Sequence, residues 1–255
     1  MQTKISLWNV FQAELFKTKN NLTKWIFLLF PVLISVIIYG YVLIDGEVFF
    51  NNPWLSIGSY LFAVYSFLYP LMLAFIAFVL YDIEYKNQGM KHLFVLPIVK
   101  SHIYISKLLS LYLYIFLSIV LAYIGFRLGG NILRILNPDL GIQNYEFIPA
   151  INVFFCKLFL ISIAIGTVQY VISQIFSNFI VSLGFASFLT VIFLLFNGWK
   201  YAYFFLYGNI FSAYKDLGFE DMEFFKKEII VAICYILIFN VIGYFVTFFK
   251  NTNKR

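Results

Sequence analysis

The sequence has 255 residues, of which 62% are hydrophobic and 12% are charged, and its mean hydropathy is +0.88. Soluble domains carry about a quarter charged residues, and no polar block of this chain is long enough to form one, so a soluble fold is excluded. The net charge of +6 does not indicate nucleic-acid binding, because the basic residues flank apolar segments instead of forming one stripe.

The N-terminal residues 4–20 predict a short amphipathic helix. Leu7, Trp8, Phe11 and Leu15 lie near one helical face. Such a helix is typical of the membrane interface, and a plain solvated leader is the alternative. No apolar core precedes a small-residue cleavage site in this region, so we expect no signal peptide.

The rest of the chain contains six apolar stretches that qualify as membrane spans. A helix needs about 20 apolar residues to cross a hydrocarbon core of about 30 Å. The sequence therefore predicts an all-α integral membrane protein with one transmembrane domain, residues 1–255. Its six expected spans are residues 25–44, 57–81, 108–126, 150–175, 179–196 and 229–249.

The distribution of basic residues predicts the orientation of these spans. With the N-terminus in the cytoplasm, eleven lysines and arginines lie inside and six lie outside. Cytoplasmic loops carry the excess of positive charge in most membrane proteins. We therefore expect both termini on the cytoplasmic side, where the N-terminal helix would rest on the membrane surface.

Few polar side chains interrupt the predicted spans. Lys157 lies within the fourth, where a charge costs about 2.5–3.5 kcal/mol at the span centre. It either snorkels outward or lines a substrate path. Gln169 and Asn240 are expected to form hydrogen bonds between helices. Cys156 and Cys234 stand alone in apolar runs, which argues against a disulfide framework or a metal site.

An aromatic segment follows the fifth span at residues 199–211. It is too short to cross a membrane, and Gly198 and Gly208 punctuate it. Two interpretations remain, an interfacial aromatic belt and a shallow re-entrant helix, and we favour the belt.

The cytoplasmic loop at residues 82–107, after the second span, is the most distinctive segment. Met90, Leu93, Phe94 and Pro97 follow the spacing of one helical face, and Gly89 allows the chain to turn just before it. A short helix would thus expose an apolar stripe that requires a cover, either the lipid surface or a groove on a partner protein.

At these residues the chain resembles the permease subunits of type-2 ABC exporters. Members combine an N-terminal interfacial helix, six spans and a loop in which Glu, Gly, an apolar pair, Leu-Pro and a basic residue follow one another. The matching positions are Glu84, Gly89, Leu93, Leu96, Pro97 and Lys107, and the leader Glu14-Leu-Phe-Lys17 is also similar. Within the family the chain looks most like the short permeases of peptide-antibiotic, or bacteriocin, immunity exporters.

The resemblance implies a function and its partners. Two permease subunits, identical or homologous, would form the substrate path in a prokaryotic plasma (inner) membrane. A separate ABC-type ATPase would dock on the short coupling helix at Glu84, Gly89, Met90, Leu93, Phe94 and Pro97, and the substrate would be a peptide or another amphipathic molecule. ATP and Mg would bind to that ATPase, and no cofactor to this chain, because the sequence lacks the Gly-x-x-x-x-Gly-Lys-Ser/Thr phosphate loop.

Other functional classes have weaker support in the sequence. His92 and His102 lie ten residues apart, about 80° apart around a helix axis, which does not suit metal chelation. The predicted spans hold no deep carboxylate for an intramembrane enzyme or an ion-coupled carrier. A membrane anchor that recruits a cytoplasmic partner without transporting anything remains the alternative, and a neighbouring ATPase gene would discriminate the two.

Overall fold

The computed structural model describes residues 6–19, 21–45, 52–85, 99–144, 149–196, 198–215 and 224–249. Within these ranges every regular element is a helix, which confirms the predicted all-α membrane class. The longer helices are α1 (Leu7–Lys17), α2 (Leu22–Asp45), α3 (Pro53–Tyr85), α5 (Lys100–Leu136), α6 (Pro149–Ile175), α7 (Phe179–Phe196) and α9 (Lys227–Phe249). The short elements are η2 (Pro138–Leu140), η3 (Ile142–Asn144), η4 (Ala202–Phe204), η5 (Leu206–Gly208) and α8 (Asn209–Lys215).

The predicted spans coincide with helices of the structure. Helices α2, α3, α5, α6 and α9 are long and apolar enough to cross a membrane, whereas α7 is a shorter apolar helix of 18 residues. The chain is therefore a multi-pass membrane protein, and the sixth crossing, by α7, stays a prediction.

Two of the helices are much longer than the stretches that hydropathy outlined. Helix α3 has 33 residues and α5 has 37, so at about 1.5 Å per residue they measure about 50 and 55 Å. Both exceed the hydrocarbon thickness of about 30 Å. Polar residues such as His102 and Arg134 continue α5 at its two ends, because a helix can run past the part of it that needs apolar side chains.

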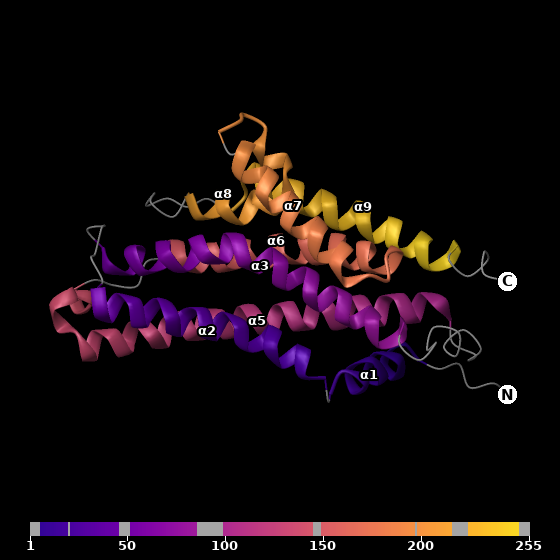
Figure 1. Cartoon of the computed structure of the whole chain (residues 1–255), viewed down its shortest axis with the longest axis horizontal. Helices are drawn as coiled ribbons and strands as arrows, with labels where there is room; N and C mark the ends of the chain where they lie inside the picture. Colours follow the sequence, from indigo (N-terminus) through magenta and orange to yellow (C-terminus); the bar gives the residue numbers. More distant parts are fainter. Residues whose placement is uncertain are drawn as a thin grey trace.

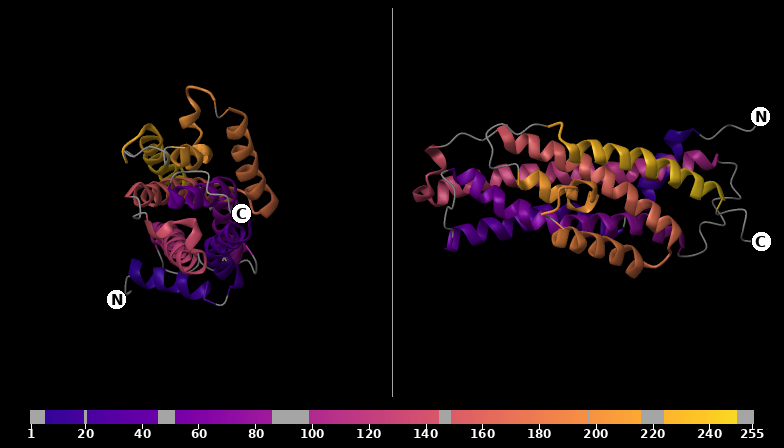
Figure 2. Two further views of the ribbon diagram at one scale, coloured as in Figure 1. Left: turned by 90° about the vertical axis from the view of Figure 1, so that its left-hand side faces the viewer. Right: turned by 90° about the horizontal axis from the view of Figure 1, so that it is seen from above.

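The helices form three layers that run nearly parallel to the long axis of the molecule (Figure 1). Helices α2 and α5 form one layer, α3 and α6 the middle one, and α7, α8 and α9 the third, and α6 packs most extensively against α9. The middle helices bury most of their spanning residues, whereas α9 leaves most of its own exposed. In the end-on view of Figure 2, α1 is seen side-on beneath the bundle, so it runs across the long helices.

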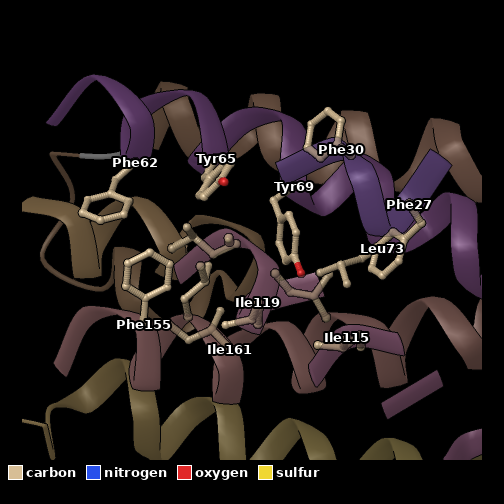
Figure 3. Packing of buried hydrophobic residues seen from close by; sticks show 14 of the residues in the cluster. Phe27, Phe30, Phe62, Tyr65, Tyr69, Leu73, Ile115, Ile119, Phe155 and Ile161 are labelled. Atoms are coloured by element: carbon tan, nitrogen blue, oxygen red, sulfur yellow. The ribbon is translucent and has the colours of Figure 1, made fainter. Parts of the chain in front are cut away.

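The core between the layers consists largely of aromatic and branched side chains. Figure 3 shows Phe62 and Tyr69 of α3 pointing toward Ile119 of α5 and Phe155 of α6. The ring centroids of Phe62 and Phe155 lie 5.5 Å apart in an edge-to-face arrangement, the geometry that aromatic pairs prefer. This contact joins α3 to α6 within the core.

Buried tyrosine hydroxyls add hydrogen bonds between these layers. The hydroxyl of Tyr65 in α3 donates to the carbonyl of Pro31 in α2 at 3.0 Å. Tyr69 donates to Ser118 Oγ of α5 at 3.1 Å, and Tyr170 of α6 donates to the carbonyl of Tyr104 in α5, also at 3.1 Å. A polar group in an apolar bundle needs such a partner, because no water replaces it.

The aromatic segment after α7 folds back onto the bundle. In its first part Trp199, Tyr201 and Phe204 are exposed, as an aromatic belt requires. In its second part Leu206 and Tyr207 are buried, and α8 then packs against α3 and α6. The interfacial belt stays a prediction for the first part, whereas the segment from Leu206 to Ala213 packs into the interior.

We expect Gly208 to be required for this return. A methyl group on Gly208 would lie 1.8 Å from Cδ2 and 1.9 Å from Cγ of the buried Phe193 ring. Gly208→Ala should lower stability by about 1–3 kcal/mol, the usual effect of overpacking, measured as thermal unfolding of the purified protein in detergent. Gly184→Ala is the matched control, because a methyl group there has no neighbour within 4 Å. Equal stability of the two variants would contradict the expectation.

Candidate functional site at the loop-bearing end of the bundle

The residues expected to dock an ATPase lie almost entirely outside the described part of the chain. Gly89, Met90, Leu93, Phe94 and Pro97 fall between residues 86 and 98. For Glu84, in the last turn of α3, only the backbone is described. The docking surface therefore stays a prediction, but α3 and α5, which lead into and out of this loop, are described up to Tyr85 and from Lys100.

A buried ion pair joins three helices close to these loop ends. The ammonium group of Lys107 in α5 lies 2.7 Å from Glu14 Oε2 of α1, and both side chains are almost fully buried. The same ammonium donates a hydrogen bond of 3.3 Å to the carbonyl oxygen of Leu80 in α3. It also lies 5.8 Å from the ring centroid of Tyr81. One side chain of α5 thus holds both α1 and the end of α3.

Glu14 has a second positive partner within its own helix. Lys17 Nζ lies 2.5 Å from Glu14 Oε1, and the Lys17 side chain is 31% exposed. Burial raises the pKa of Glu14, but the nearby charges of Lys107 and Lys17 outweigh that effect and hold this pKa below its ordinary value of 4.5. The pair therefore contributes to stability above pH 4.5, and this contribution is lost as the pH falls through the lowered pKa.

The face that α1 turns toward α5 is more polar than expected. Val10, Glu14 and Thr18 are its buried residues, four positions apart in each step, and Thr18 forms a hydrogen bond with the hydroxyl of Tyr114 in α5. By contrast, Trp8 of the predicted apolar face is 63% exposed. Polar contacts therefore attach α1 to the bundle, and Trp8 remains free to contact lipid.

This site brings together residues that the sequence had placed in two separate motifs. Glu14 and Lys17 belong to the leader, and Lys107 to the basic end of the loop pattern, 93 positions from Glu14. No motif in the sequence pointed directly to their contact. One usable signal was the position of Lys107 directly before the predicted span 108–126. A charge that becomes buried at such a position needs a partner of opposite sign.

Lys157 also forms a buried ion pair, far from the loop-bearing end. Its side chain is fully buried, and Nζ lies 3.2 Å from Glu228 Oε1 in the first turn of α9. Outward snorkelling of Lys157 is therefore wrong, because the packed side chains of the bundle enclose the ammonium and a carboxylate neutralises it. A role of Lys157 in the substrate path stays a prediction.

The amides within the spans join helices, as expected from the sequence. Gln169 Nε2 donates to the hydroxyl of Tyr207 at 2.6 Å, and Gln169 Oε1 accepts from Ser182 at 3.2 Å. Asn240 Nδ2 donates to the hydroxyl of Tyr112 at 3.3 Å. These bonds connect α6 to η5 and α7, and α9 to α5.

We expect loss of the buried pair to release α1. Glu14→Gln removes the carboxylate that lies 2.7 Å from the ammonium of Lys107, and loss of one partner of a buried ion pair typically costs about 3–5 kcal/mol. Amide hydrogen exchange should then be more than about 100-fold faster in α1, because a helix of 11 residues is unstable without its docking contact.

Two further variants control this measurement. Lys17→Met removes the half-exposed partner and should cost less than about 1 kcal/mol. The double variant Glu14→Gln with Lys107→Met removes both charges of this pair, so it should regain part of the loss. If exchange in α1 is unchanged by Glu14→Gln, the pair does not hold this helix.

Comparison with known protein families identifies the family of this chain. The model of a family described as "ABC-2 family transporter protein" matches residues 10–193, which include the ion pair and the loop. No curated protein matches the sequence. Proteins of this family are the membrane subunits of transporters and associate with an ABC-type ATPase. Because the match covers more than half of the chain, this protein belongs to the ABC-2 family of transporter proteins and is a permease component of an ABC transporter.

Proposed function

We propose that the chain is the permease subunit of an ABC exporter. It forms the substrate path together with a second permease, identical or homologous, and a separate ATPase that binds ATP and Mg drives it. The observation that carries the proposal is the Lys107–Glu14 pair, which joins α1, α3 and α5 beside the predicted docking loop. Family membership supports the same function.

The pair gives the proposed ATPase a mechanical connection to the bundle. Leu80 lies five residues before the end of α3, and Lys107 lies seven residues after the start of α5. A displacement of the loop between these helices acts on both of them at once. Helix α1 follows, because separating Glu14 from Lys107 would expose two buried charges to an apolar surrounding. The three helix ends therefore move as one rigid body, a common element of transport cycles.

The proposed orientation places this end of the bundle in the cytoplasm of a prokaryotic cell. Helix α1 and the end of α9 lie at the same end of the molecule (Figure 1), which is compatible with two cytoplasmic termini. The basic residues of the loop and of both terminal segments support the same direction. The exported substrate is a peptide or another amphipathic molecule, as the resemblance to immunity exporters suggests.

Thiol labelling tests this orientation. Single cysteines are introduced at Asn51, Asn144, Lys91 or Lys254 in a background that carries Cys156→Ala and Cys234→Ala. In intact cells an impermeant thiol reagent should label positions 51 and 144, and label positions 91 and 254 only after the cells are opened. Labelling of position 91 or 254 from outside would overturn the proposed orientation.

A double substitution tests the docking of the ATPase. Burial of one Leu or Phe side chain contributes about 1.5–3 kcal/mol, so Leu93→Ala with Phe94→Ala should weaken docking by about 4 kcal/mol if the effects add. That is roughly a thousandfold loss of affinity, measured as co-purification of the ATPase with the permease in detergent. The abundance of the variant in the membrane should stay normal, because the spans do not depend on these side chains.

Leu128→Ala with Ile132→Ala is the matched control for this test. Both residues are exposed on α5, more than five turns from its loop end, so ATPase binding should not change. If the Leu93/Phe94 variant keeps both its ATPase and its ATP-dependent transport, the stripe rests on lipid. A chain that binds the ATPase but supports no ATP-dependent transport would be a non-transporting anchor.

A further inference from the structure

A hydrophobic pocket of about 480 Å³ lies between α5 and α6, toward the end of the bundle remote from α1. On α5 its wall consists of Phe116, Ile119, Val120 and Tyr123, which follow the spacing i, i+3, i+4 and i+7. These positions share one helical face about 10 Å long. The pocket thus runs along the helix axes.

Helix α6 forms the opposite wall with the same periodicity. Asn152, Phe155, Cys156 and Phe159 occupy the positions i, i+3, i+4 and i+7, and Phe224, just before α9, closes the pocket. This wall is polar at one end, where Asn152 lies, and apolar at the other end, where Phe159 lies. The volume lies within the range of ordinary small-molecule sites, about 300–1,000 Å³.

The surface around the pocket is apolar. Phe116 is 50% exposed, and Leu117 and Ile124 beside it on α5 are also exposed. In a membrane protein such side chains face the hydrocarbon of the lipid. A molecule that enters this pocket therefore comes from the bilayer, and its apolar part matches the lining.

One end of the pocket is polar, and a positive charge lies just beyond its lining. The Tyr123 hydroxyl donates a hydrogen bond of 2.9 Å to Asn152 Oδ1. The Arg127 guanidinium, one helical turn beyond Tyr123, lies 5.8 Å from the centroid of the Tyr123 ring. A ligand with an apolar tail and a negatively charged head fits both parts at once.

We propose that this pocket binds an acyl chain of an anionic membrane phospholipid, with the phosphate head group near Arg127. The tail supplies dispersion contacts that the lining of an empty apolar pocket lacks. The head group contacts the guanidinium, a group that recognises phosphate well. This site is separate from the ion pair at the loop-bearing end. It does not depend on the direction of transport or on ATPase docking.

Photo-crosslinking with a lipid probe tests the proposal. The full-length protein is reconstituted into phosphatidylcholine vesicles that contain phosphatidylglycerol with a diazirine in its acyl chain, and adducts are mapped by mass spectrometry. They should concentrate in residues 116–123 and 152–160, about tenfold above the exposed face of α9, which corresponds to about 1.4 kcal/mol of preference. An equivalent phosphatidylcholine probe should label the same residues less.

Two variants separate the roles of the tail and the head group. Cys156→Trp should place a bulky ring in the pocket and lower the concentration of adducts there. Cys234→Trp is the matched control, because Cys234 is an exposed cysteine on α9, away from the pocket. Arg127→Gln should remove the preference for phosphatidylglycerol while adducts persist in the pocket.

Three results would overturn the proposal. Adducts spread evenly over the exposed helices would mean that lipid has no specific site here. Equal labelling of the wild-type pocket by both probes would mean that the head group is not recognised. Absence of adducts in these residues, together with Cys156–Cys156 cross-links between two chains, would mean that a second copy covers the pocket. Each result is obtained with the wild-type protein, so none depends on the folding of a variant.

Discussion

The fold depends on one constraint, that polar groups inside an apolar bundle must find their partners within the protein. Water is not available to them, and an unpaired buried charge costs several kcal/mol. Lys107 satisfies this requirement with Glu14 and the carbonyl of Leu80, and Lys157 satisfies it with Glu228. Each pair joins helices that are distant in the sequence. The buried charges therefore determine which helices are held together at each end of the molecule.

The same constraint connects the fold to the proposed transport cycle. Apolar attraction between helices is non-directional, so helices that shift can form new apolar contacts in place of the old ones. A buried ion pair cannot slide in this way, since each charge would lose its partner. Within that cycle the contact of Glu14 with Lys107 makes α1 part of the moving body, and the exposed Trp8 of α1 is predicted to contact the membrane surface. In the proposed function, movement at the loop would be transmitted to the interface helix as well as to the spans.

Hydropathy predicted the helices and missed the contacts between them, for a physical reason. The cost of exposing apolar groups to water acts on every residue separately, so windows such as 229–249 predict α9 closely. The pairing of Lys157 with Glu228 depends on two residues 71 positions apart, and neither window contains both. Helix α5 extends beyond the predicted span 108–126 at both ends for a related reason. Hydropathy responds to the length in contact with lipid, whereas the backbone hydrogen bonds continue through Arg134.

The segment after the short helix α7 returns along the bundle and adds buried polar contacts to it. Helix α7 has 18 residues, about 27 Å, which is less than the lengths of α2, α3, α5, α6 and α9. The chain then returns along the bundle, and Asn209 at the start of α8 is fully buried with Nδ2 3.5 Å from the carbonyl of Glu228. Glu228 in turn pairs with Lys157 of α6. The contacts of Glu228 with Asn209 and Lys157 therefore join α8, α6 and the first turn of α9 in one polar cluster.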